Sequence, residues 1–158
     1  MAGDFFGVNV APGEEPGTDD YILERLADLG IQQVRMDFSY GSPGGSAQGL
    51  LDRLLEAGYR VFLNVFPPLT EAEILHEDVE AQQRWCQFLD ALFAGYSDRV
   101  ICFEIGNTPN RGRWSGFSSR SFLVAWHLAE ERAGAHEITL AGPNVSDFEP
   151  LYKGTNLS

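Results

Sequence analysis

The stretch Val100-Ile101-Cys102-Phe103-Glu104-Ile105-Gly106-Asn107-Thr108-Pro109-Asn110 decides the fold of this chain. Its first six residues are mostly apolar, which predicts a strand over residues 100–105. The turn formers Gly, Asn and Pro follow at once, so this strand ends in a compact polar turn. In barrels of alternating strands and helices, active sites lie at the C-terminal ends of the strands. We therefore expect a candidate site at residues 106–110.

Outward from this stretch, the chain alternates between strand and helix patterns. Further strands are predicted at residues 5–10, 31–38, 60–65 and 138–141, the first of them buried. Helical patterns separate the strands, and this spacing indicates parallel βαβ units with right-handed crossovers. The expected fold class is therefore α/β. Periodicity alone does not choose between a barrel and an open doubly wound sheet.

The ends and faces of the predicted helices can also be assigned. Thr18 is the expected N-cap of the first helix, and Gly30 is expected to end it. Ser118 or Ser119 is the expected cap of the last helix, whose inner face is expected to hold Phe122, Leu123 and Trp126. Residues 41–49 are so rich in Gly and Ser that we expect an irregular loop there.

The composition is that of a globular protein. The chain has 158 residues, of which 44% are hydrophobic, enough for one domain with a real core. Its net charge of −12 argues against nucleic acid and anionic membranes as partners, because both bind clustered Lys and Arg, and it fits a neutral or cationic ligand. No apolar run approaches the roughly 20 residues of a membrane span. The N-terminus lacks a signal-peptide pattern, so we expect a cytoplasmic protein unless a leader was removed.

Other chemistries find no support in the sequence. His76, His127 and His136 have no metal-ligand spacing, either among themselves or with Cys86 and Cys102. The sequence holds no Walker loop and no nucleophile elbow. We therefore expect no metal and no cofactor. The two cysteines cannot build a disulfide framework and are expected to be buried free thiols.

The turn Asn107-Thr108-Pro109 resembles the Asn-Glu-Pro signature that ends the fourth strand of clan A glycoside hydrolases, the retaining TIM-barrel enzymes. In that family the Glu is the general acid/base, and Thr108 stands in its place here. A Thr hydroxyl does not titrate in the useful range, so it cannot protonate a leaving oxygen. General acid catalysis contributes about 100- to 10,000-fold to a rate, and the resemblance implies that this contribution is missing.

Three further stretches match the family in the right order along the chain. Residues 31–38 look like its second strand, where an Arg, here Arg35, supports the nucleophile. Residues 58–64 are similar to its third strand, and residues 141–144 resemble the turn after its fifth strand. The resemblance implies that residues 1–158 form one partial domain, the first four or five βα units of a (β/α)8 TIM barrel.

The family's second catalytic group has no match in this sequence. The nucleophile of the family is a Glu at the end of strand seven, whereas this chain ends near strand five. A complete barrel takes about 250 residues. Retaining hydrolysis needs two carboxyl groups about 5 to 5.5 Å apart, so we assign no intact catalytic pair, and any nucleophile is expected outside this sequence.

Four residues are candidates for contact with a sugar. The resemblance implies that Asn107 binds a sugar 2-hydroxyl, although an Asn before Thr-Pro is also an ordinary turn former. Trp114 lies in a Gly-rich loop and is expected either to stack on a pyranose face or to pack on its own loop. Asn64 and Asn144 stand at strand ends and are weaker candidates of the same kind.

Charged residues fall close to these candidates. Asp37 faces the same side of its strand as Arg35 and is expected to orient that Arg or to meet a sugar hydroxyl. Glu104 is expected to be buried and paired with Arg35 or another polar partner. Asp147 and Glu149 follow the fifth strand and could approach the site, although loop acids are usually only solvated.

The expected function is that of a glycoside hydrolase-like protein that acts on or binds an oligosaccharide or polysaccharide through an incomplete catalytic site. The alternative is a non-catalytic carbohydrate-binding or scaffolding protein derived from a glycosidase. A third possibility is a truncated gene product. A partial barrel exposes unpaired strand edges, so such a chain is expected to aggregate, to pair with a second copy, or to take a second chain that completes the barrel.

Overall fold

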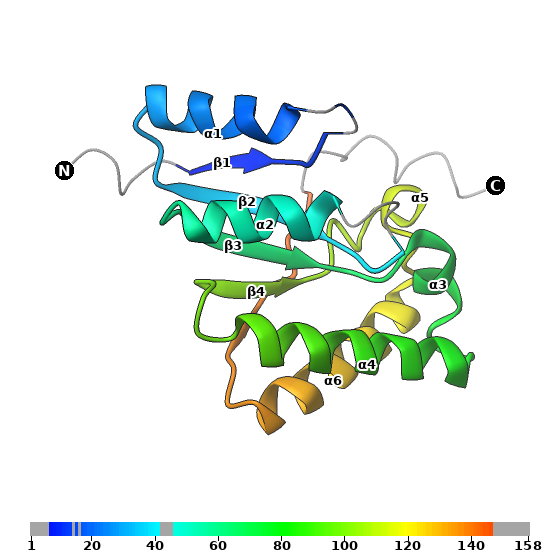
Figure 1. Ribbon diagram of the computed structural model, residues 1–158. Helices are drawn as coiled ribbons and strands as arrows, with labels where there is room; N and C mark the ends of the chain where they lie inside the picture. The colour runs from blue at the N-terminus through cyan, green and yellow to red at the C-terminus, as the bar shows by residue number, and fades with distance from the viewer. Residues whose placement is uncertain (1–6, 14, 16, 42–45, 147–158) are drawn as a thin grey trace.

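The computed structural model describes residues 7–13, 15, 17–41 and 46–146 and confirms the α/β class (Figure 1). Its elements are β1 (Gly7–Val10), α1 (Thr18–Asp28), β2 (Gln33–Phe38), α2 (Ser46–Glu56), β3 (Arg60–Val65), α3 (Leu69–Ile74), α4 (Val79–Tyr96), β4 (Cys102–Ile105), α5 (Gly112–Ser115), α6 (Ser119–Ala135) and β5 (Leu140–Ala141). The predicted residues Phe5 and Phe6 of the first strand, and the candidate acids Asp147 and Glu149, lie outside the described residues.

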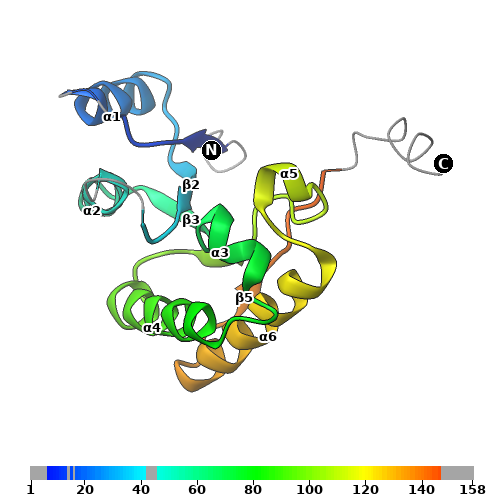
Figure 2. The same ribbon diagram turned by 90° about the vertical axis from the view of Figure 1, so that its right-hand side faces the viewer.

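The five strands form one sheet in the order β1-β2-β3-β4-β5, and every neighbouring pair is parallel. Each strand therefore lies beside the strand that follows it in the chain. Right-handed crossovers that always step in one direction place all their helices on the same face of the sheet. Figure 2, a view along the strands, shows α1, α2, α4 and α6 in an arc on one side of the sheet.

The two faces of the sheet differ in chemistry because successive side chains of a strand point to opposite faces. We call the face under the helices the helix-covered face. Its residues belong to the core and are 0–2% exposed: Val34, Met36, Val61, Leu63, Val65, Phe103 and Ile105. We call the other the polar face. The strand register brings Asp37 opposite Asn64, and Asn64 opposite Glu104, so polar groups of three strands meet on it.

Helices α4 and α6 pack against each other through a face of α6 that the sequence did not predict. The buried residues of α6 are small: Ser121, Ala125, Ala129 and Ala133. The expected inner-face residue Leu123 is 55% exposed, so that prediction is wrong. The cause is Trp85 of α4, which is fully buried and donates its indole N–H to the Ala125 carbonyl at 3.1 Å. Small side chains let the α6 backbone come that close.

Several element ends were predicted well, and others were not. Gly30 follows α1 with a positive φ of 65°, and Ser118 caps α6 through a capping box with Ser121, both as expected. The N-cap of α1 is Gly17, because the Thr18 hydroxyl donates to the Glu15 carbonyl instead.

Three expectations about exposure and regularity were wrong. In β1 the side chains alternate between exposed and half-buried, because nothing described pairs with its outer edge, so this strand is not a buried one. Residues 46–49 are the first turn of α2 and not loop, since Ala47 and Leu50 bury against the sheet. Cys86 and Cys102 are free, as expected, but only half-buried. Across the described part of the chain, no helix is both long and apolar enough to cross a membrane.

Candidate functional site

A charged cluster lies on the polar face at the C-terminal ends of β2 and β4. The Arg35 Nε donates to Glu104 Oε2 at 2.8 Å, and Arg35 Nη2 lies 2.7 Å from the same oxygen. Arg35 Nη1 donates to Asp37 Oδ1 at 3.0 Å. The expected Glu104–Arg35 pair is therefore confirmed, and Asp37 takes the first of its two expected roles, which is to orient Arg35.

Asn64 supports this cluster from β3, the strand between β2 and β4. Its side chain is fully buried, and its Nδ2 donates to Glu104 Oε2 at 3.0 Å and to the Gly106 carbonyl at 3.1 Å. Its Oδ1 has no hydrogen-bond partner among the described residues. The amide thus ties the Glu104 carboxylate to the backbone of the following turn, and no face of Asn64 is open to a ligand.

Asn107 extends the cluster to the end of β5. Its Nδ2 donates to Asp37 Oδ2 at 3.0 Å, and its Oδ1 accepts from Asn144 Nδ2 at 3.2 Å. The backbones of Asn107 and Asn144 also form an isolated parallel bridge. Six polar residues near the ends of four strands therefore form one hydrogen-bonded group. We call this group the polar network: Arg35, Asp37, Asn64, Glu104, Asn107 and Asn144.

The carboxyl group of Asp37 has a raised pKa. Desolvation by burial is the largest cause, and the nearby Glu104 charge adds to it. The Arg35 charge and the hydrogen bonds from Arg35 and Asn107 act in the opposite direction without cancelling the rise. Asp37 therefore holds a proton to a higher pH than an isolated Asp does.

The turn after β4 has a constrained backbone. Gly106 has a φ of 85°, and a Cβ there would lie 2.7 Å from the Phe122 ring, so only Gly fits. Thr108 has a φ of 46°, a conformation that a β-branched residue rarely adopts and that costs about 1–3 kcal/mol. Its carbonyl accepts the Arg111 N–H at 2.8 Å. Asn110 holds the next loop, because its side chain bonds both the carbonyl and the N–H of Ser146.

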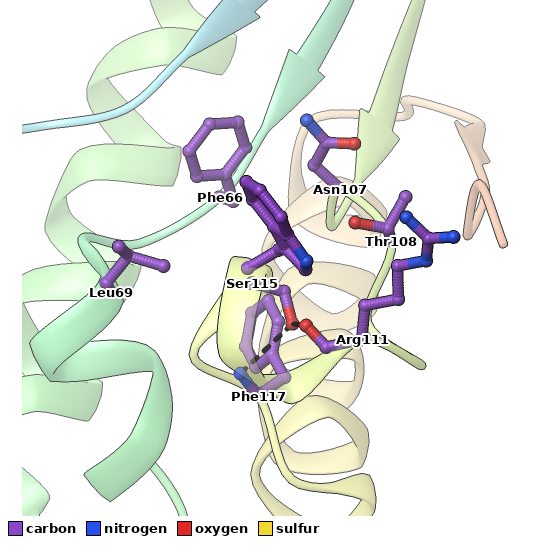
Figure 3. Close-up of a pocket in the computed structure, with 8 residues that line it drawn as sticks. Phe66, Leu69, Asn107, Thr108, Arg111, Ser115 and Phe117 are labelled. Atoms are coloured by element: carbon purple, nitrogen blue, oxygen red, sulfur yellow. Dashed lines mark hydrogen bonds between the residues drawn. The ribbon is translucent and has the colours of Figure 1, made fainter. Parts of the chain in front are cut away.

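Beside the polar network lies a pocket of about 300 Å³. Figure 3 shows Phe66 and Leu69 facing Thr108 and Arg111 across it, with Ser115 and Phe117 at its base. Its described lining is Phe66, Leu69, Asn107, Thr108, Arg111, Trp114, Ser115 and Phe117. Trp114 is 73% exposed, so most of its ring does not pack on its own loop. Of its two expected roles, this exposure leaves the ring open for stacking.

One predicted site residue, Asn107, belongs to both the polar network and the pocket lining. Thr108 and Trp114 line the pocket only. Sequence reasoning missed most of the wall: Phe66, Leu69, Arg111, Ser115 and Phe117. The one available signal was that Phe66 directly follows β3, at the same edge of the sheet as Asn107. The close approach of α3 and α5 could not be foreseen: a Cβ on Gly116 would lie 2.4 Å from the Leu69 carbonyl oxygen.

The chemistry available here is hydrogen bonding and stacking. Within the described ranges, no group of three or more His, Cys, Asp or Glu side chains is arranged to hold a metal ion. Both carboxylates of the network are already bound by Arg35. The Asn107 amide and the exposed Trp114 indole line the pocket, which suits a polar ligand with a flat apolar face.

Comparisons with known proteins identify no family for this chain. No protein-family model matches the chain, and no curated protein matches it either. The resemblance to clan A glycoside hydrolases therefore stays a prediction from residues 31–38, 58–64, 107–109 and 141–144.

Proposed function

We propose that this protein is a glycoside hydrolase-like saccharide-binding protein whose site lies at the C-terminal ends of β2 to β5. The observation that carries the proposal is the polar network. Residues 35, 107 and 144, chosen from the resemblance at three separate strand ends, meet in one hydrogen-bonded group next to a pocket with an exposed Trp.

The sheet supports the barrel part of this proposal. A doubly wound sheet reverses its strand order and carries helices on both faces, which makes both faces apolar. Here the order is sequential, and one face holds Arg35, Asp37 and Glu104 with partly exposed side chains. These features favour the first βα units of a (β/α)8 barrel, whose inner side is the polar face.

The pocket has the groups that recognise sugars. The exposed indole of Trp114 offers a flat face for the C–H side of a pyranose ring. Asn107 uses one Nδ2 hydrogen on Asp37 and one Oδ1 lone pair on Asn144, so a second donor and a second acceptor remain for hydroxyls. Since its partners hold the amide in place, little conformational entropy is lost when a sugar binds.

The second candidate function is saccharide binding without hydrolysis, and the same geometry favours it. Thr108 lines the pocket where the family carries its acid, and the two network carboxylates are ion-paired with Arg35. Neither Asp37 nor Glu104 is in the described lining of the pocket, so neither is placed to protonate a leaving oxygen of a ligand held there. Hydrolysis by this site therefore requires an acid and a nucleophile other than Asp37 and Glu104.

Binding is the first test because it does not depend on a nucleophile. Calorimetry with a panel of neutral and acidic tri- to hexasaccharides should find saturable binding. Trp114→Ala should weaken it about fivefold to 150-fold, since loss of an aromatic stacking partner removes on the order of 1–3 kcal/mol, while the free energy of unfolding stays unchanged. Leu123→Ala, at another exposed apolar residue outside the described pocket lining, is the control. No binding to any saccharide would contradict the proposal.

Hydrolysis separates the two candidate functions. Thr108→Glu restores the carboxyl group of the family signature and should raise aryl-glycoside hydrolysis if the site is that of a glycosidase. Saccharide binding with no turnover in either protein supports the non-catalytic candidate.

A further inference from the structure

The side-chain amide of Asn107 links the polar network to the pocket, so its orientation decides which groups a bound molecule meets. Its Nδ2 donates to Asp37 Oδ2 at 3.0 Å, and its Oδ1 accepts from Asn144 Nδ2 at 3.2 Å. The same side chain lines the pocket (Figure 3). Turning this amide over would exchange its N–H donor and its oxygen acceptor at each of these contacts.

The charge of Asp37 distinguishes between the two orientations of the Asn107 amide. An ionised carboxylate only accepts hydrogen bonds, so it attracts the Asn107 Nδ2 and repels the Asn107 Oδ1. Asn144 cannot fix the orientation, because its own amide can turn over and present either a donor or an acceptor. The direction of the hydrogen bonds that run from Asn144 through Asn107 is therefore set at the Asp37 end.

The two carboxylate oxygens of Asp37 have different partners. Oδ1 accepts from Arg35 Nη1 at 3.0 Å, and Oδ2 accepts from Asn107 Nδ2. A guanidinium stays protonated, so Oδ1 keeps its donor and a proton added to this carboxylate goes to Oδ2. A protonated Oδ2 can donate to the Asn107 Oδ1. Protonation therefore makes the opposite orientation of the Asn107 amide available.

We propose that ionised Asp37 is a positioning residue for the ligand site: it holds the Asn107 amide in one orientation, with a second N–H and a second lone pair available to sugar hydroxyls, and acidification releases this amide. The inference rests on the proposed function for the nature of the ligand. Asp37 acts through Asn107, since it is not in the described lining of the pocket itself. An amide that is fixed beforehand loses less conformational entropy when a sugar binds.

The charged groups around Asp37 define the pH range of this effect. Burial and the Glu104 charge raise the pKa of Asp37 above its ordinary value of 3.8, and Arg35 acts in the opposite direction without cancelling the rise. Asn64, opposite Asp37 on β3, does not titrate, and β1 has no titratable side chain. Affinity for a neutral sugar should therefore increase as the pH rises through the raised pKa of Asp37. The contribution of Asp37 to the free energy of unfolding changes in the other direction, so a loss of stability cannot imitate this effect.

The test is calorimetry from pH 3 to pH 7 with cellotriose, mannotriose and xylotriose, neutral sugars without a group that titrates in this range. Affinity for a sugar that binds should rise about twofold to tenfold with the pH, which corresponds to one hydrogen bond. Because coupling is reciprocal, binding should also release protons near the raised pKa. The release appears as a binding enthalpy that depends on the ionisation enthalpy of the buffer. Asp37→Asn should bind at every pH with the affinity of the acidified wild type and release no protons.

Asp28→Asn is the matched control, because it removes the same charge from an exposed position of α1. It should keep both the pH dependence and the proton release. An affinity that does not change with pH overturns the inference and leaves the proposed function standing. A pH dependence that survives Asp37→Asn does the same.

A measurement without sugar separates the inference from the proposed function. In NMR spectra of the free protein, the side-chain N–H resonances of Asn107, assigned by their loss in Asn107→Ala, should shift as Asp37 titrates. They should not shift with pH in Asp37→Asn. No shift in the wild type overturns the inference. A shift without binding of any saccharide supports Asp37 as the group that orients Asn107 and overturns the proposed function alone.

Discussion

The two faces of the sheet are made by alternate residues of the same strands, yet they have different physical tasks. On the helix-covered face, Leu63 and Phe103 are 0% and 1% exposed and belong to the hydrophobic core. On the polar face, one residue away, Asn64 and Glu104 hold Arg35 and the turn after β4. The helix-covered face thus carries the hydrophobic core and the polar face the ligand chemistry, so a substitution in the core should lower stability and leave ligand affinity unchanged.

The largest effect is expected on the helix-covered face. Leu63→Ala removes a fully buried side chain, and the cavity should lower the free energy of unfolding by about 2–5 kcal/mol. Urea denaturation measures this loss. Saccharide affinity of the folded variant should stay at the wild-type value. A change in affinity as large as that of Trp114→Ala would show that the two faces are not independent.

On the polar face a smaller loss of stability is expected. Arg35→Met leaves Asp37 and Glu104 without their cation, and because the cluster is partly exposed we expect a cost of about 1–3 kcal/mol, less than for a fully buried pair. Glu104→Gln should cost less in the Arg35→Met background than in the wild type. A double-mutant cycle by urea denaturation gives that coupling, and strict additivity would contradict the described ion pair.

One substitution in the turn after β4, at Thr108, should increase the free energy of unfolding. Thr108→Gly relieves the positive φ and should raise the free energy of unfolding by about 1 kcal/mol. Thr139→Gly is the control, since the described Thr139 has no positive φ, and Gly there should destabilise the protein. If both variants lose stability equally, the strain assigned to Thr108 is wrong.

The smallest effect is a pH dependence. The raised pKa of Asp37 means that the folded chain keeps this proton at pH values where the unfolded chain has released it. The contribution of Asp37 to the free energy of unfolding therefore falls as the pH rises from the ordinary Asp pKa of 3.8 through the raised pKa. Asp37→Asn removes that dependence. Urea denaturation from pH 3 to pH 7 should therefore show the free energy of unfolding of the variant rising relative to that of the wild type as the pH increases. Asp28→Asn, on exposed α1, controls for the change in net charge.

Much of the fold was predictable because its signals are local. Hydrophobic periodicity gave the strands and the longer helices, and single residues such as Gly30 and Ser118 gave their ends. The inner face of α6 was not predictable, because the position of Trp85 on another helix decides which side packs. Short helices α3 and α5 carry too few residues for a periodic signal.

The candidate site was predictable in its polar part only. Parallel strands bring their C-terminal ends to one edge, so Arg35, Asp37 and Asn107 had to be near each other once the strands were placed. The individual hydrogen bonds of the polar network depend on side-chain conformations, which the pattern of residue types along the sequence does not predict. The pocket wall was missed because Phe66 and Phe117 come from loops that tertiary packing alone brings together.

The sequential order of the strands has a consequence for how the chain folds. Each described strand after β1 pairs with the strand before it in the chain, so this sheet can form strand by strand during synthesis. The six-residue strands β2 and β3 pair along their whole length, whereas β5 has two residues. Amide hydrogens should therefore exchange most slowly in β2 and β3 and fastest in β5, where local opening exposes the Asn144 end of the polar network first.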